Sequence, residues 1–181
     1  MLTTSLLGVI FLINLPEVLG GGHDLIIKLT EKQYTLKLLL LILVIKFVYT
    51  LISYSSSAPG GIFLPMLVIG SLIGNIYALI LIKLFNLDSI YNINFVVLGM
   101  AGYFASVVRA PITGIILITE LVGSFNYILP LSLASFTSYV VAEFLREEPI
   151  YEVLLDRLLG NKLENKELGL EAKKRPYLKY K

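Results

Sequence analysis

The sequence predicts an all-α, polytopic membrane protein with broken and re-entrant helices. Hydrophobic residues make up 56% of the chain and charged residues only 15%, whereas soluble domains carry about 25% charged residues. Residues 1–145 hold six basic and six acidic side chains, while the remaining nine basic and seven acidic residues crowd into residues 146–181. Several apolar runs also approach the length of a membrane-spanning helix. We therefore expect an apolar body embedded in a lipid bilayer, followed by a solvated tail.

The composition excludes several classes of function. The chain has no cysteine and one histidine, which rules out disulfides, thiolate metal sites and cysteine nucleophiles. The body carries no basic stripe of the kind that binds nucleic acid. An integral-membrane enzyme would need clustered histidine or acidic residues on facing helices, and the acidic residues of the body are widely separated. We expect no enzyme, no metal site, no cofactor and no nucleic-acid partner.

The long apolar runs predict the membrane-spanning helices. Crossing a hydrocarbon core of ~30 Å takes ~20 helical residues. Leu2–Leu15 is apolar and stops at Pro16, as expected for the end of a spanning helix. Three later runs are long enough to span, namely Leu36–Tyr54, Ile62–Phe85 and Tyr127–Leu145.

Two shorter apolar runs predict helices that break inside the membrane. Phe95–Val108 and Ile112–Val122 look too short to cross alone, and Arg109–Pro111 separates them. Half-length helices at membrane depth survive only where protein buries them or where they line a polar cavity, so such breaks point to a transporter's binding site. A bundle of helices merely kinked by proline remains the alternative. Pro149 opens a last amphipathic segment that runs to Leu159.

The run SSSAPGGIFLP stands directly before the second long span and has the features of an anion site. The first amides of a helix have no intrahelical acceptor, and the helix dipole makes that end positive. Gly60 and Gly61 let the chain turn sharply and an ion approach closely, and Pro65 falls in the first turn. The amides of Gly61, Ile62 and Phe63 would then face the ion. A glycine-rich loop that only caps a spanning helix at the membrane surface remains the alternative.

Five segments together resemble the CLC family of chloride channels and chloride/proton antiporters. GGIFLP resembles the family's GGIFxP signature. The other segments follow in the family's order: PEVLGGGHDLI at residues 16–26, GMAGYF with RAPITGIIL at 99–117, ELVG with LP at 120–130, and EPIYEVLL at 148–155. The resemblance implies the C-terminal part of the CLC chloride channel fold over residues 1–160, with a charged cytoplasmic tail at 161–181.

The resemblance also implies which residues bind the ion. Family members hold chloride with main-chain amides that correspond to Ile62 and Phe63, next to Gly61, and with a hydroxyl that corresponds to Tyr151. A phenol is a neutral donor, so it binds an anion without adding a charge that would hold the ion too tightly. Without the family motif, Tyr151 would be read as an interfacial anchor. Further residues belong to the pore-supporting and helix-break motifs: Gly60, Pro65, Arg109, Pro111 and Glu120.

Two other family signatures, GSGIP and GREGP, do not occur in the sequence. We therefore expect a C-terminal piece of a CLC protein that is inactive alone and needs the N-terminal part of the fold. The implied function is chloride transport as a voltage-gated-type channel or a chloride/proton antiporter, and both remain open. The implied partners are small anions, the lipid bilayer and a second copy in a homodimer, with chloride as substrate and no cofactor. The alternative is a membrane scaffold or assembly subunit that transports nothing.

The tail and the isolated charges complete the expectations. The basic residues of the tail place the C-terminus in the cytoplasm by the positive-inside rule, in a protein of the plasma membrane. We expect Arg109 to end a helix while its head reaches water, and Glu120 to serve packing or dimer support. His23 and Asp24 are expected in a solvated turn. No role is assigned to Lys46, which lies within a predicted span.

Overall fold

The computed structural model describes residues 22–31, 34–55, 61–146, 148–156 and 159–160. Residues up to Phe144 and residues from Leu145 onward form two compact units. The helices of the first unit are α2 (His23–Glu31), α3 (Leu36–Ser55), α4 (Phe63–Phe85), α5 (Asn92–Val108), α6 (Pro111–Val122) and α7 (Ile128–Phe144), with 3-10 turns η2 (Ser89–Tyr91) and η3 (Phe125–Tyr127). In the second unit, residues 150–156 are helical. The predicted helix at Leu2–Leu15 and the tail at 161–181 lie outside the described residues.

The described helices confirm an all-α, polytopic architecture. Within the described part of the chain, four segments are long and apolar enough to cross a membrane: Leu36–Ser53, Phe63–Phe85, Ser89–Val108 and Phe125–Phe144. The predicted spans therefore match α3, α4 and α7 to within a few residues. Helix α6, with 12 residues, is the short helix that the sequence predicts.

The expectation that the run at Phe95–Val108 is too short to span is wrong. Helix α5 begins at Asn92, and η2 extends the segment back to Ser89. Asp88 stabilises this start because its side chain accepts a hydrogen bond from the Ile90 amide at 3.2 Å. Ser89 and Asn92, although polar, therefore lie in the first turns of the segment.

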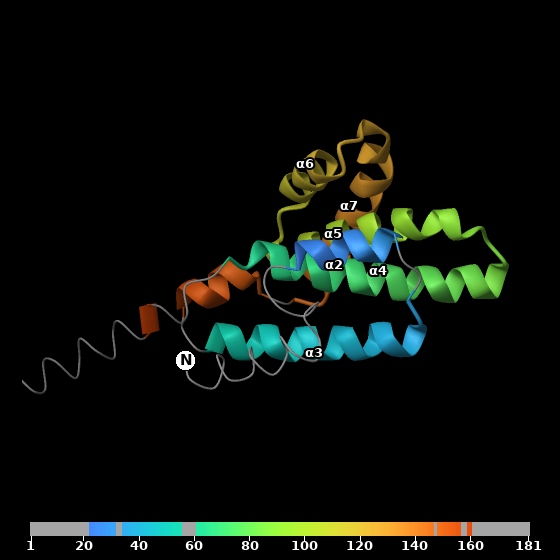
Figure 1. Ribbon diagram of the computed structural model, residues 1–181. Helices are drawn as coiled ribbons and strands as arrows, with labels where there is room; N and C mark the ends of the chain where they lie inside the picture. Colours follow the sequence, from blue (N-terminus) through green and yellow to red (C-terminus); the bar gives the residue numbers. More distant parts are fainter. Residues whose placement is uncertain (1–21, 32–33, 56–60, 147, 157–158, 161–181) are drawn as a thin grey trace, which may run out of the picture. The chain divides into compact units, whose positions relative to one another are not determined.

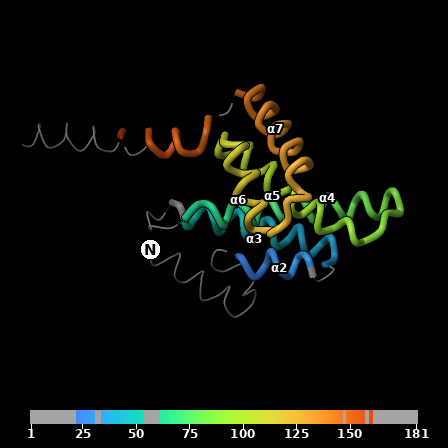
Figure 2. Tube along the Cα trace, turned by 90° about the horizontal axis from the view of Figure 1, so that it is seen from above, coloured from blue at the N-terminus to red at the C-terminus, as the bar shows by residue number. Residues whose placement is uncertain are grey.

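Glycines bring α4 and α5 into direct backbone contact. A Cβ at Gly70 would lie 2.7 Å from the carbonyl oxygen of Gly99, and a Cβ at Gly74 would lie 3.0 Å from the Cα of Val96. Gly70 and Gly74 are one turn apart, in the small-xxx-small spacing that lets membrane helices approach closely. The two helices run side by side, and the pair passes between α2 and α7 (Figures 1 and 2). This pair is the centre of the first unit.

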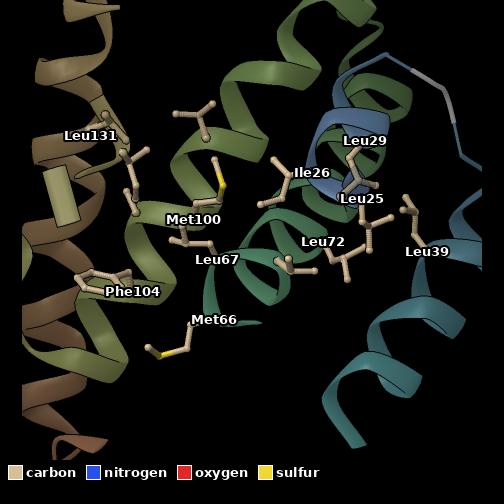
Figure 3. Close-up of a cluster of buried hydrophobic side chains, with 14 of the residues drawn as sticks. Leu25, Ile26, Leu29, Leu39, Met66, Leu67, Leu72, Met100, Phe104 and Leu131 are labelled. Carbon is tan, nitrogen blue, oxygen red and sulfur yellow. The ribbon is translucent and has the colours of Figure 1, made fainter. Parts of the chain in front are cut away.

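Helix α2 is held on the α4–α5 pair by both apolar and polar contacts. Leu25 and Leu29 of α2 belong to a buried cluster that also contains Leu72 of α4 (Figure 3). At the carboxyl end of α2, the Leu29 carbonyl accepts hydrogen bonds from the side-chain amides of Asn75 at 3.1 Å and Asn92 at 3.2 Å. The last carbonyls of a helix lack intrahelical donors, and these two amides satisfy one of them, that of Leu29.

Lys46 of α3 is buried, with 1% of its surface exposed. Its Nζ would lie 3.4 Å from a Cβ placed on Gly22, and Gly22 adopts a left-handed conformation with φ of 82°. Lys46 thus packs beside the turn that starts α2. His23 and Asp24 are the first residues of that helix, so the expected turn is wrong, while their expected exposure is confirmed.

Candidate functional site

The candidate site is built around the start of α4. Phe63 is the first helical residue, and Ile62 is the N-cap but makes no side-chain capping hydrogen bond. The Ile62 carbonyl accepts the Met66 amide at 3.2 Å, which closes the first turn, and Pro65 has no amide hydrogen to leave unsatisfied. The amides of Phe63 and Leu64 come before the Met66 amide, the donor that closes the first turn, and have no intrahelical acceptor. The predicted start of this helix and the position of Pro65 in its first turn are confirmed.

The backbone at Gly61 is open. A Cβ placed on Gly61 would meet no atom of the described residues within 4 Å, and its φ is outside the left-handed region. Steric crowding within the described chain therefore does not explain a glycine here. Gly60 lies outside the described residues.

The side-chain ring of Phe63 packs against the protein. The polar group that this residue offers is its main-chain amide. The ring meets Phe104 of α5 edge to face, with centroids 5.6 Å apart and planes at 81°. Phe104 itself is only 4% exposed. A Cβ on Gly114 of α6 would lie 2.8 Å from Cδ1 of Phe104, so α5 and α6 both surround the ring that supports the start of α4.

Arg109 marks the break between α5 and α6, and its side chain ties this break to α7. Its backbone is left-handed, with φ of 62°, and its amide donates to the Ala105 carbonyl at 3.1 Å. Its guanidinium donates to the Tyr139 carbonyl at 3.1 Å and to the Ala142 carbonyl. The predicted helix end is confirmed. The expectation that the head reaches water is wrong, since only 8% of the side chain is exposed.

The carbonyls that Arg109 binds lie near the carboxyl end of α7. That end carries the negative pole of the helix dipole, so a cation placed there is favourable. Arg109 also pairs with Glu143 at 3.3 Å, but the Glu143 side chain is 69% exposed, and exposed ion pairs contribute little. The hydrogen bonds to main-chain carbonyls are therefore expected to contribute more to this contact than the ion pair does.

The other two predicted motif residues, Pro111 and Glu120, occupy opposite ends of α6. Pro111 is its first residue, following Ala110 as N-cap, where the missing amide hydrogen is not needed. Glu120 is exposed and lines an apolar cavity of about 540 Å³ together with Thr119 and Phe125. Residues 61–65 do not line that cavity, so the described structure does not bring Glu120 to the start of α4.

Tyr151 belongs to the second compact unit. It lies in the helix at residues 150–156, and 53% of its surface is exposed. Its pairing with Ile62 and Phe63 stays a prediction.

Sequence reasoning missed residues that support the site and the core. Phe104 and Gly114 lie within the segments GMAGYF and RAPITGIIL that resemble the family, but the motifs do not indicate that these two residues contact each other. The GSLIG run that contains Gly70 and Gly74 was a readable signal of close helix packing. Asn75 gave no such signal, because its partner on α2 is distant in sequence.

The apolar helices and the breaks between them are typical of polytopic integral membrane proteins. A family model described as "Voltage gated chloride channel" matches residues 1–143. The chain belongs to this family.

Individual relatives agree with the family match. The chain is 41% identical over 172 residues to the "H(+)/Cl(-) exchange transporter ClcA" of Vibrio cholerae serotype O1 (strain M66-2), covering 93% of this chain and 37% of that protein. The ClcA protein of Vibrio campbellii is 38% identical over the same length. That of Klebsiella pneumoniae (strain 342) is 38% identical over 145 residues, covering 80% of this chain and 31% of the relative. The chain thus spans less than two-fifths of the length of these relatives.

Proposed function

We propose that this chain forms part of the ion path of a chloride transporter. The observation that carries the proposal is the start of α4, where Ile62 and Phe63 follow Gly61, which no described residue crowds, in a chain of the voltage gated chloride channel family. The similarity to proteins named H(+)/Cl(-) exchange transporters supports chloride as the transported ion.

The proposed ion contacts are the main-chain amides at Ile62 and Phe63, beside Gly61, and the hydroxyl of Tyr151. Helix-start amides attract an anion through partial charges. Neutral donors bind it without a full opposite charge, so the ion can leave again, as conduction requires. Chloride is the substrate in this proposal, and the chain acts as a transporter subunit with no enzymatic activity, cofactor or metal.

The proposed ion path needs the part of the fold that the chain does not match. The chain covers 37% of the Vibrio cholerae relative, and an ion path lined on one side only would leave polar groups facing lipid, at several kcal/mol each. We therefore expect the chain by itself to pass no chloride. Transport would require the N-terminal part of the fold.

The proposed setting is the plasma membrane, with a cytoplasmic C-terminus and a second copy of the chain as partner. Exposed apolar side chains on α6 and α7 support a lipid or protein neighbour there, among them Ile112, Ile116, Leu129, Leu133 and Val140. The basic residues after residue 145 support the orientation.

A complemented assembly tests the proposal. The full chain is co-expressed and co-purified with the portion of the Vibrio cholerae relative that precedes the matched region, then reconstituted into liposomes loaded with chloride. We expect chloride efflux from the complemented assembly and none from liposomes that hold only this chain. A co-purified assembly that passes no chloride would contradict the proposal and favour a scaffold role, and efflux from the chain alone would contradict the need for the remaining fold.

A backbone substitution separates the amides from general packing effects. Replacing Phe63 by its α-hydroxy acid turns its amide into an ester, which removes one N–H and keeps the side chain. We expect the ester to weaken chloride binding about tenfold, as for loss of a hydrogen bond to a charged group. Unchanged chloride affinity would remove the Phe63 amide from the site.

A further inference from the structure

The ring of Phe104 lies where three helices meet. It belongs to α5, packs edge to face on Phe63 at the start of α4, and faces Gly114 of α6. Phe104 is buried, with 4% of its surface exposed, and is part of the central apolar cluster (Figure 3). Helices α5 and α6 therefore determine the position of the ring, and the ring in turn contacts the start of α4.

Little free space surrounds this ring. A single methyl group added at Gly114 would lie 2.8 Å from Cδ1 of Phe104 and 3.4 Å from Cε1. Because protein interiors are close-packed, a ring in such contact moves only if its neighbours move too. The glycine at 114 therefore allows Phe104 to occupy its observed place.

Phe104 in turn restrains the first residue of α4. Ile62 makes no side-chain capping hydrogen bond, so this helix start lacks the usual restraint of an N-cap side chain. The edge-to-face contact of Phe63 with Phe104, at 5.6 Å and 81°, is a favoured aromatic geometry. It fixes the Phe63 side chain and, through its Cα, the direction of the Phe63 amide.

We propose that Phe104 is a positioning residue for the Phe63 amide, and that position 114 is glycine because a side chain there would displace Phe104. The inference rests on the proposed function, in which that amide binds chloride. Hydrogen bonds weaken steeply as the donor turns away from the acceptor. A displaced Phe104 ring therefore weakens chloride binding although no donor is removed.

The test compares Gly114→Ala, Phe104→Leu and the combined variant in the complemented assembly, with the chloride dissociation constant measured by isothermal titration calorimetry. We expect each single change to weaken binding about fivefold, the size of one imperfect hydrogen bond. The combined variant binds no more weakly than Phe104→Leu alone, because leucine at 104 leaves room for the methyl group at 114. If the two substitutions only weakened core packing, their separate losses of chloride affinity would instead add in the combined variant.

A second cycle combines Gly114→Ala with the Phe63 ester. If Gly114 and Phe104 act through the Phe63 amide, Gly114→Ala has no further effect once that N–H is gone. Gly102→Ala is the matched control, since its Cβ would lie 3.5 Å from Oγ of Ser138, an ordinary contact. It should keep chloride affinity within about twofold. If Gly114→Ala does not assemble, Phe104→Leu replaces it in the cycle with the ester.

The outcomes separate this inference from the proposed function. An ester without effect on chloride affinity removes the amide site and the positioning role together. An ester that weakens binding, with Gly114→Ala and Phe104→Leu both silent, overturns only the positioning role. The positioning role is also overturned if Phe104→Leu weakens chloride binding equally in the chain with the Phe63 amide and in the chain with the Phe63 ester.

Discussion

The glycines within α4 and the glycine just before it have opposite surroundings. In its middle, a Cβ on Gly70 would lie 2.7 Å from a backbone oxygen of α5. At its start, a Cβ on Gly61 would touch no atom of the described residues within 4 Å. The middle of the helix is thus closed by α5, whereas no described residue closes the position just before its start.

Under the proposed function, the difference separates a requirement of folding from a requirement of ion binding. A glycine in tight backbone contact is explained by the helix that packs on it. A glycine beside open space and uncapped amides has no such explanation within the described chain, which is the arrangement expected where an ion approaches. Glycine therefore marks close helix packing at Gly70 and the candidate site at Gly61.

The largest expected effect comes from Gly74→Val in the packed middle. The added side chain would collide with the backbone of Phe95 and Val96, which cannot yield without separating α4 from α5. We expect a loss of about 3 kcal/mol or more, measured as aggregation or early unfolding in detergent by size-exclusion chromatography and thermal denaturation.

Gly102→Ala is the control for this change. Gly102 lies on α5, the helix that packs on Gly74, but its Cβ would make only an ordinary contact, and alanine favours the helix by roughly 1 kcal/mol. A folded, monodisperse Gly74→Val protein would show that the close contact between α4 and α5 is not needed and would break the comparison.

The next largest effect is expected from Gly61→Val at the open start. The described chain has room for the side chain, and the backbone of Gly61 is not left-handed, so folding should be unchanged. Chloride efflux from the complemented assembly should fall at least about tenfold, because the side chain keeps the ion from the amides. Wild-type efflux would show that the open space has no role in transport, while a folding defect would assign it to packing with the rest of the fold.

The smallest effect is expected from Asn75→Ala, a substitution that tests how α2 is held on the packed middle of α4. Asn75 follows Gly74, is 2% exposed, and donates to the Leu29 carbonyl at the end of α2. The loss should be about 1–2 kcal/mol, read from thermal denaturation, since Asn92 still donates to the same carbonyl. The double variant with Asn92→Ala should lose more than the sum of the single changes. Strict additivity would mean that the two amides act independently.

The apolar runs were sufficient to place the long helices. The sequence predicts spans at Leu36–Tyr54 and Ile62–Phe85, and the structure has helices at Leu36–Ser55 and Phe63–Phe85. The start of α5 was missed because Asn92 is polar, and its partner, the carbonyl of Leu29, is remote in sequence. Hydropathy cannot show that a distant backbone group satisfies a polar side chain.

The candidate site was predicted in part. The motif placed Ile62 and Phe63 at a helix start, which the structure confirms, while their pairing with Tyr151 stays a prediction. The support for that helix start could not be read from the motif. It comes from Phe104, 41 residues after Phe63, and becomes visible only when α5 packs against α4.

By itself, the sequence determined the membrane class, the apolar helices, the break at Arg109 and the family, because these follow from the chemistry of neighbouring residues. The tertiary structure decided that α5 crowds Gly70 and Gly74 while no described residue crowds Gly61, that Arg109 binds the end of α7, and that Lys46 is buried beside Gly22. These features depend on contacts between helices, and the distance between two groups across a helix interface exists only once the chain has folded.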